Sequence, residues 1–426
     1  MASSLFRRSD PGLAHALKSH MNTASGRLLV WLGSGLIAIA ATSHAMYREV
    51  STFGRPEGIQ TGVDFLKNTW LATRDLVSGV NIYAQARLVI PDIGRGILAA
   101  SPHVPGSLLW QAPFAALPPR AAVFAYAFVS ILAIWAGVFI LISPKDPPSV
   151  FLAACCGAFA IAVGGGPVAL LLGQPTGFTV LGLALLVRAR QPWLAGLGFM
   201  LAASTLQTGL PLALALLALG NWRVVWRGAV LIVASSLPPV LLEVANAGFR
   251  AFATSFVSGG DVHVMRLSNR IDLGALLQRL GISIPGLRIG SGVLVAVLAL
   301  AFLAWLPARL RRIDYPPVLC LVIAFTTLCT YHQPYDMLLV AGVVVPVILA
   351  NGQSRAMLMN GPSRAMINIL GLAVTSAWLS TYTIIFFYAP VALAGIGMLS
   401  ALALLRAKSD ARMVPELEEP RAGALT

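Results

Sequence analysis

The stretch RAAVFAYAFVSILAIWAGVFILI, residues 120–142, carries a single charged side chain, at its first position. A run of about 20 apolar residues is what a helix needs to cross a bilayer. The whole chain has the same character, because 57% of its 426 residues are hydrophobic and 11% are charged. A soluble domain carries about 25% charged residues. The runs are longer than the alternating segments of an outer-membrane barrel, so the sequence predicts an all-α polytopic membrane protein.

About twelve apolar runs, separated by turn residues or charges, are the predicted spans. They cover 28–46, 120–142, 150–171, 176–188, 193–206, 211–221, 225–243, 291–308, 315–331, 335–350, 366–386 and 388–405. The region 193–219 could be one long span, but Gln207, Gly209 and Pro211 interrupt it. Glycine and proline inside such a run favour a break between two helices.

The distribution of positive charge predicts the orientation. With the N-terminus inside, the short turns near 172–175, 207–210, 332–334 and 387 face outward and contain no Lys or Arg. Cytoplasmic loops are the ones that carry excess Lys and Arg. The segments predicted to be cytoplasmic hold Arg7, Arg8, Lys18, Arg27, Lys145, Arg188, Arg190, Arg223, Arg227, Arg309, Arg311, Arg312, Arg355, Arg364, Arg406, Lys408, Arg412 and Arg421.

This orientation gives three parts to the chain. Residues 1–27 form a cytoplasmic N-terminal segment, 28–405 a transmembrane domain, and 406–426 a cytoplasmic tail whose polar composition predicts disorder. Two long loops, about 47–119 and 244–290, fall outside, and long loops in compact proteins are usually functional. The Arg7–Arg8 pair resembles a twin-arginine signal, with cleavage after Ala45 as an alternative, but the first run is long enough to be a retained span.

Composition also narrows the chemistry. The net charge of +14 is accounted for by residues that flank membrane helices, so it does not indicate a nucleic-acid partner. The cysteines, which lie in apolar runs, are predicted to be small core residues: Cys155, Cys156, Cys320 and Cys329. The sequence has no P-loop, nucleotide fingerprint or zinc-type His/Glu motif, and we expect neither a cofactor nor a metal.

The first outer loop contains GVDFLKNTW, residues 62–70, which predicts a short amphipathic helix. Asp64, at its start, could be an ordinary N-cap or a catalytic acid. Leu66, Trp70, Thr73 and Val77 share one helical face, so the helix is expected to lie on the membrane interface with Trp70 at headgroup depth.

Other polar residues gather at turns predicted to lie on the same side. Gln174 follows LLLG, Asn269 and Arg270 precede an amphipathic segment, and TYHQPYD, residues 330–336, places Tyr331 and His332 between two spans. Polar and ionisable residues at membrane depth are costly and suggest function. The alternative is a polar cluster that only ties helix ends together.

Taken in order, these motifs resemble glycosyltransferase family 87, a group of polyprenyl-phosphate-sugar-dependent, mannosyltransferase-related enzymes in the GT-C superfamily. The resemblance covers roughly residues 28–400. It rests on GVDFLKNTW with SGVNIY, a proline-rich approach to the second span, the LGQ turn, an Asn followed by a Leu-rich segment, and TYHQPYD. It implies a GT-C-type helical bundle with amphipathic helices in both outer loops.

The resemblance also implies the roles of residues. Asp64 becomes the general base that takes the proton of the acceptor hydroxyl. His332, Arg270 and Lys67 are expected on the phosphate side, where cations stabilise the departing polyprenyl phosphate. The remaining donor-site residues are Gln174, Asn269 and Tyr331, which would hydrogen-bond the sugar or the phosphate.

The implied partners are a polyprenyl-phosphate-linked sugar, a glycolipid or glycan acceptor and membrane lipids. The implied location is the bacterial inner membrane, with the site on its periplasmic face. Two departures from the family pattern stand out: Gln207 replaces an expected cation, and His103 lies near an expected aromatic residue. A transporter or flippase, a non-catalytic scaffold and a pentose transferase specific for arabinofuranose remain alternatives.

Overall fold

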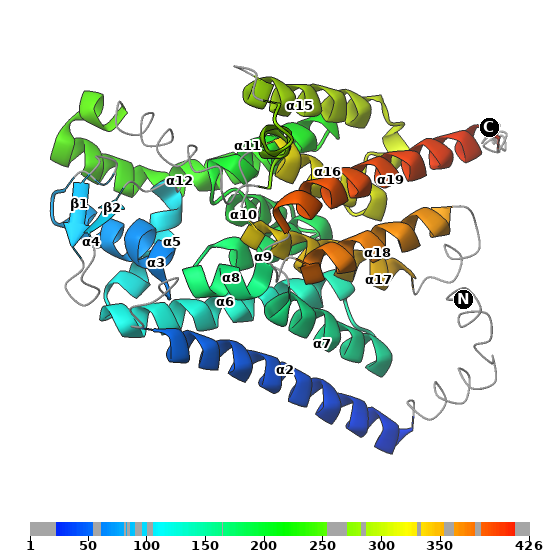
Figure 1. Ribbon diagram of the computed structural model, residues 1–426, viewed down its shortest axis with the longest axis horizontal. Coiled ribbons are helices and arrows are strands. Elements are labelled where there is room, and N and C mark those ends of the chain that lie inside the picture. Colours follow the sequence, from blue (N-terminus) through cyan, green and yellow to red (C-terminus); the bar gives the residue numbers. More distant parts are fainter. Residues whose placement is uncertain are drawn as a thin grey trace, which may run out of the picture.

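The computed structural model describes residues 23–53, 61–80, 82, 86–89, 96–99, 105–163, 165–253, 271–282, 287–329, 334–352, 362–379 and 385–413. Within these ranges the chain is almost entirely helical (Figure 1). The elements of the N-terminal half are α2 (Ala24–Thr52), α3 (Val63–Phe65), η1 (Leu66–Leu71), α4 (Ala72–Val77), β1 (Ala86–Val89), β2 (Gly96–Ala99), α5 (Pro105–Ala115), α6 (Pro119–Ile142), α7 (Pro147–Ala162), α8 (Gly165–Leu172), α9 (Thr176–Arg188) and α10 (Pro192–Ala202).

The C-terminal half continues the helical pattern. Its elements are α11 (Leu206–Ala218), α12 (Trp222–Ala247), α14 (Leu273–Arg279), α15 (Leu287–Trp305), η3 (Ala308–Leu310), α16 (Pro316–Cys329), η4 (Pro334–Met337), η5 (Val340–Val344), α17 (Val345–Gly352), α18 (Pro362–Leu379) and α19 (Ile385–Met413). In Figure 1, α3, α4, α5 and the β1–β2 hairpin gather at one end, opposite the start of α2 and the end of α19.

Each predicted apolar run contains a helix, although several boundaries differ. The break near Pro211 falls earlier, since α10 ends at Ala202 and α11 already contains Pro211. The run 150–171 is divided into α7 and α8. The tail predicted to be disordered from residue 406 begins as helix, because α19 continues to Met413.

Four helices among the described residues are long and apolar enough to be candidate spans: α2, α6, α12 and the 389–407 part of α19. The bent pair α7–α8 would be a fifth, and the other apolar helices are shorter, 10–17 residues. The structure therefore supports a helical membrane protein, whereas the number of about twelve spans remains a prediction.

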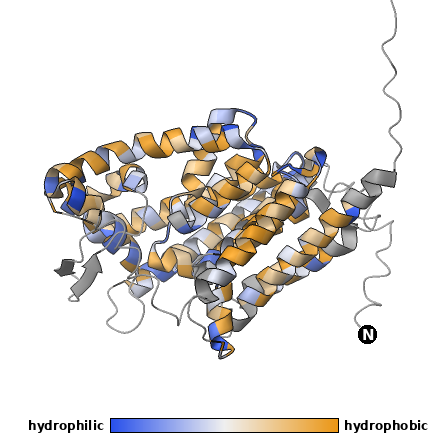
Figure 2. Cartoon of the chain, turned by 90° about the horizontal axis from the view of Figure 1, so that it is seen from above, coloured by the Kyte–Doolittle hydropathy of each residue, from blue (hydrophilic) through white to orange (hydrophobic). Residues whose placement is uncertain are grey.

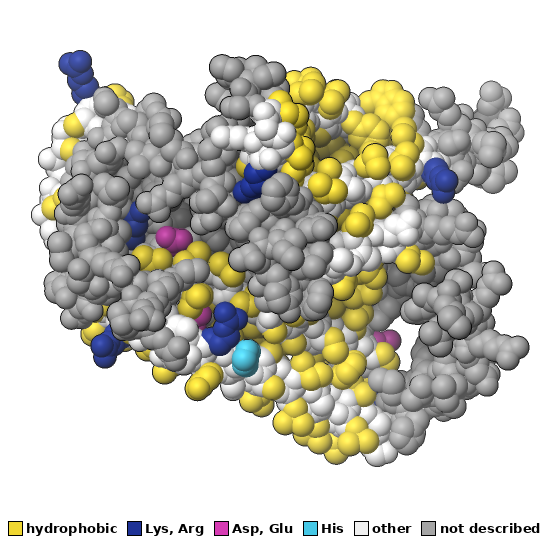
Figure 3. Space-filling model, in the orientation of Figure 1, with side chains coloured by type: hydrophobic (Ala, Val, Ile, Leu, Met, Phe, Trp, Pro, Cys, Tyr) yellow, Lys and Arg dark blue, Asp and Glu magenta, His cyan; other side chains and the backbone are white. Residues whose placement is uncertain are grey.

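Large apolar side chains point outward along the longest helices. Leu28, Leu32 and Leu36 of α2 and Val233 and Leu237 of α12 are each more than half exposed. Figure 2 shows helices that are hydrophobic over most of their length, and Figure 3 shows hydrophobic side chains over much of the described surface, with scattered Lys and Arg. Contiguous apolar surface of this kind is rare on soluble monomers, so these faces are suited to lipid.

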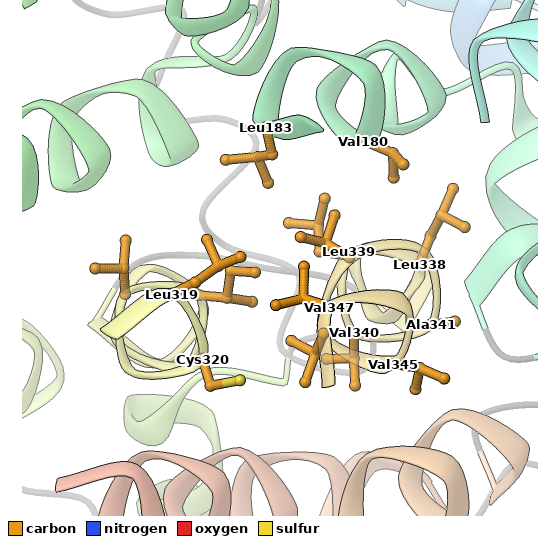
Figure 4. Close-up of a cluster of buried hydrophobic side chains, with 14 of the residues drawn as sticks. Val180, Leu183, Leu319, Cys320, Leu338, Leu339, Val340, Ala341, Val345 and Val347 are labelled. Carbon is orange, nitrogen blue, oxygen red and sulfur yellow. The ribbon is translucent and has the colours of Figure 1, made fainter. Parts of the chain in front are cut away.

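The interior is built around α16 and the η5–α17 helix. Every residue of α16 from Pro316 to Leu328 is buried, and Figure 4 shows its side chains packing with those of η5, α17 and α9. Cys156 and Cys320 are buried as predicted, and none of the four cysteines forms a disulfide. Close packing of small and branched side chains is what remains to hold helices together in lipid.

One feature departs from the all-α prediction. Strands β1 and β2 form an antiparallel hairpin in which Ala86 pairs with Ala99 and Val89 with Gly96. ARLV and GILA are short stretches that contain β-branched residues, and the turn residues between them permit a hairpin. The sequence predicts only helices in this loop.

Two glycine turns join the first outer loop to the apolar helices. At the end of α8, Gly173 has φ +71°, its N–H donates to Leu170 O at 2.9 Å, and the Gln174 N–H donates to Ala169 O at 2.8 Å. This is the Schellman arrangement that ends helices at a left-handed glycine. Leu171 O, which is left over, accepts from the Gly62 N–H at 2.6 Å, so the backbone before α3 completes the end of α8.

These turns leave no room for side chains. A Cβ on Gly173 would lie 2.4 Å from Phe65 Cβ, and a Cβ on Gly62, which has φ +69°, would lie 2.5 Å from Val123 Cγ2. Thr52, at the end of α2, and Thr61 share a hydrogen bond of 2.6 Å. The start of α3 is thus fixed against α2, α6 and α8.

We expect Gly173→Ala to destabilise the protein more than Gly220→Ala. Both glycines have positive φ, but nothing lies within 4 Å of a Cβ on Gly220. Each substitution incurs the left-handed penalty of about 1–2 kcal/mol, and Gly173→Ala adds overpacking of about 1–3 kcal/mol. Thermal midpoints of the two variants in detergent measure the difference, and equal midpoints would contradict the close contact.

Candidate active site

Asp64 lies in the first turn of a continuous helix formed by α3, η1 and α4. The N-cap is Gly62, whose left-handed backbone begins the helix without a side-chain cap. The interpretation of Asp64 as an N-cap is therefore wrong, because the helix starts before it. Its carboxylate is left for another partner, on the α8–α9 turn.

That partner is Gln174, whose Nε2 donates a hydrogen bond to Asp64 Oδ2. Gln174 is 8% exposed, whereas Asp64 is partly exposed. Among the described residues, no hydrogen bond reaches Oδ1 of Asp64. Within the described part of the chain, one carboxylate oxygen is held and the other is available for a proton.

The surroundings make this carboxyl group more basic than a free aspartate. Burial raises the pKa of Asp64, while the positive charge of Lys67 and the hydrogen bond from Gln174 oppose the shift. Desolvation disfavours the charged form, and a nearby cation or donor favours it. A carboxylate with a raised pKa is a better proton acceptor near neutral pH.

An aromatic cluster joins the elements that surround Asp64. Phe65 stacks on Tyr126 of α6 with centroids 4.2 Å apart, and Phe114 of α5 meets Phe65 edge-on at 6.1 Å. Phe178, one helical turn after Gln174, packs against Tyr126 at 5.7 Å and Trp110 at 4.6 Å. These rings bind the elements that carry Asp64 and Gln174 into one unit, at about 0.5–1.5 kcal/mol for each aromatic pair.

A second buried polar pair lies further along the same helix. Thr69 Oγ1 donates to Gln111 Oε1 at 3.0 Å, and both side chains are 1% exposed. Gln111 Nε2 has no hydrogen-bond partner among the residues that the structure describes. The sequence reading missed this pair, although a glutamine within the apolar segment LLWQAPF is the signal that marks it.

The prediction that this helix lies on the membrane interface, with Trp70 at headgroup depth, is wrong. Leu66, Trp70 and Thr73 are buried at 0%, 6% and 8% exposure, and Trp70 Nε1 donates to Leu117 O at 2.9 Å. Val77, assigned to the same face, is 74% exposed. Beyond the π-helical segment η1, the buried side chain is that of Leu76, which is 4% exposed.

Four predicted donor-site residues lie outside the described residues: Asn269, Arg270, Tyr331 and His332. Their described neighbours are placed. Asp272 caps α14 by accepting from the Ala275 N–H at 3.1 Å, and η4 follows the His332 turn. Contacts link α3 to α8, α8 to η4, η4 to α19 and α19 to α14. The structure brings together Asp64, Lys67 and Gln174, and it places the flanks of the others on connected elements.

Of the two departures from the family pattern, one lies within the described residues. Gln207 lies in the first turn of α11, and His103 is outside the described residues. No group of three or more His, Cys, Asp or Glu side chains that could hold a metal is found in the described part of the chain. That the reaction needs no metal stays a prediction.

The fold and the site define an integral membrane protein in which an ionisable side chain is held on a short helix beside the apolar helices. The sequence profile of glycosyltransferase family 87 matches residues 103–330. This range is more than half of the chain, so the protein belongs to that family and is a glycosyltransferase. It includes Gln174, Asn269 and Arg270, while Asp64, Tyr331 and His332 lie outside it. No curated protein and no solved structure matches the chain.

We expect Thr69→Val and Gln111→Leu to be coupled. Thr69→Val leaves the buried Gln111 carbonyl without its donor, which costs about 1–3 kcal/mol. The double variant should lose less stability than the sum of the single variants, because it removes both polar partners together. Unfolding in mixed micelles measures the coupling, and strictly additive losses would contradict the buried hydrogen bond.

Proposed function

We propose that the protein transfers a hexose, mannose by the family resemblance, from a polyprenyl-phosphate carrier to a glycolipid or glycan acceptor. The reaction takes place on the outer face of a bacterial inner membrane, and the fold is of the GT-C type. The observation that carries this proposal is the Asp64 carboxylate, with Oδ2 held by Gln174 and Oδ1 without a partner among the described residues. Family membership supplies the reaction class.

In this reaction Asp64 is the general base. Its Oδ1 takes the proton of the acceptor hydroxyl as the hydroxyl oxygen attacks the anomeric carbon. The bond between that carbon and the phosphate oxygen breaks, and polyprenyl phosphate leaves with the electron pair. One displacement inverts the anomeric configuration. The raised pKa of Asp64 suits this role, since a general base works best when its pKa lies near the operating pH.

The donor side needs positive charge more than it needs an acid, because a phosphate is a good leaving group. His332 and Arg270 are proposed for this role together with Lys67, whose charge acts on Asp64. Asn269 and Tyr331 are proposed to hydrogen-bond the sugar or phosphate. The contacts of α8 with both α3 and η4 support a shared site, since η4 directly follows the His332 turn.

We expect Asp64→Asn to lower kcat about 100- to 10,000-fold, the usual contribution of a general base. The assay gives the protein in liposomes radiolabelled polyprenyl-phosphate-mannose and membrane acceptor lipids. Asp75→Asn is the matched control, because Asp75 lies on α4 of the same helix and has no assigned role.

Each other outcome of this assay is informative. Equal transfer by the wild type and Asp64→Asn would remove Asp64 from the mechanism. Transfer from a polyprenyl-phosphate-arabinofuranose donor in place of the mannose donor would support the pentose alternative. An absence of transfer from every sugar donor would favour a transporter or a scaffold.

We expect Val77→Cys to react with a membrane-impermeant maleimide in intact cells, in a background without the native cysteines. Val77 is 74% exposed and belongs to the loop predicted to be outside. Ala72→Cys, at 3% exposure on the same helix, should remain unlabelled, and Lys145→Cys should be labelled only after permeabilisation. Labelling of Lys145→Cys alone in intact cells would reverse the proposed orientation.

A further inference from the structure

The backbone around Gln174 fixes the position of its side chain. Gly173 ends α8 in a left-handed conformation, and the Gln174 N–H is bonded to Ala169 O, so the position of its Cα is set by the end of the helix. Pro175, which has a restricted φ, follows directly. The side chain is 8% exposed, which leaves it little freedom to swing toward solvent.

The acceptor of its hydrogen bond is fixed as well. The helix that carries Asp64 is held to α8 by the bond from Gly62 N–H to Leu171 O, 2.6 Å long, and by the contact of Gly173 with Phe65. The donor and acceptor of the Gln174–Asp64 bond therefore belong to two turns that are joined through their backbones. A bond between two such anchored groups constrains the direction of the carboxylate.

We propose that Gln174 is a positioning residue, whose amide holds Oδ2 of Asp64 so that Oδ1 is presented to the acceptor hydroxyl. This inference rests on the proposed function, in which Asp64 is the base. It differs from the role that the family resemblance implied for Gln174, a hydrogen bond to the sugar or phosphate of the donor.

The neutrality of the amide matters to the chemistry. An arginine or lysine at this place would pair with the carboxylate and reduce its tendency to accept a proton. A glutamine supplies direction with a weaker stabilising effect, since a hydrogen bond from a neutral donor adds no full charge. Among the described charged groups only Lys67 acts electrostatically on Asp64.

The two roles of Gln174 make opposite kinetic predictions for Gln174→Leu. If Gln174 positions Asp64, its loss should lower kcat about 10- to 100-fold through misalignment of the carboxylate, and the donor KM should not change. Loss of the hydrogen bond also favours the protonated carboxyl, so the acid limb of the kcat profile should move up by about one to two pH units. If Gln174 instead binds the donor, the donor KM should rise and the acid limb of the kcat profile should not move.

The experiment measures donor KM and kcat against pH for the wild type, Gln174→Leu and Gln174→Glu. Gln174→Glu should move the acid limb further than Gln174→Leu, because two adjacent carboxyl groups share a proton. Gln191→Leu is the matched control: Gln191 caps α10 by accepting from the Leu194 N–H and should leave the pH profile unchanged. A raised KM, or an acid limb that does not move in either variant, would overturn the proposal.

A second measurement does not depend on the donor. The carboxyl band of protonated Asp64 is followed by infrared difference spectroscopy against Asp64→Asn as the pH is lowered. Titration of this band at higher pH in Gln174→Leu supports the contact and its effect on Asp64, and an unchanged titration overturns it. If the band shifts while Asp64→Asn retains full transfer activity, Gln174 positions Asp64 but the proposed base is wrong, so the two failures are distinguishable.

Discussion

The hydrogen bond from the Gly62 N–H to Leu171 O fixes the outer loop onto the apolar helices. Carbonyls at the end of a helix need partners, and near a bilayer water is a scarce one. At the end of α8 the Schellman turn supplies two of the donors and Gly62 supplies a third. If the loop moved away, the Leu171 carbonyl would lose its hydrogen-bond partner. Asp64, which the loop carries, is therefore held next to the apolar helices.

This constraint brings groups from distant parts of the sequence into one arrangement. Asp64 and Gln174 are 110 residues apart, and the elements that carry them are joined through the rings of Phe65, Tyr126 and Phe178. Burial raises the pKa of the Asp64 carboxyl group, while the amide limits where the carboxylate points. The same amide, with Lys67, also opposes the rise in pKa that burial causes.

The parts of this structure that local sequence determines could be predicted, and those set by long-range packing could not. Apolar runs indicate helices wherever they occur, so the sequence predicts α6, α9 and α16. The partner of Asp64 could not be derived in this way, because nothing in GVDF specifies a glutamine 110 residues later.

The burial of Trp70 also could not be predicted from the local sequence. Leu66, Trp70 and Thr73 are all buried, as residues on one helical face would be, but nothing in LKNTWL tells whether that face meets lipid or the neighbouring helices. Gln111 was visible as a polar residue among apolar ones, but its partner Thr69 was not. The structure leaves the His332 and Arg270 segments undescribed, so their roles still rest on the resemblance.

The π-helical turn at Leu66–Leu71 has a consequence for the register of the chain. Each helical residue turns the chain by about 100°, so removing one residue between Asp64 and Thr69 while the wide turn is kept would rotate the part of the helix before the deletion relative to the part after it. Asp64 could then face Gln174, or Thr69 and Trp70 could keep their partners, but both sets of contacts could not be retained. The number of residues between Gly62 and Leu76 is thus as much a part of the site as their identities, and it distinguishes chains that can share this geometry from those that only share its aspartate.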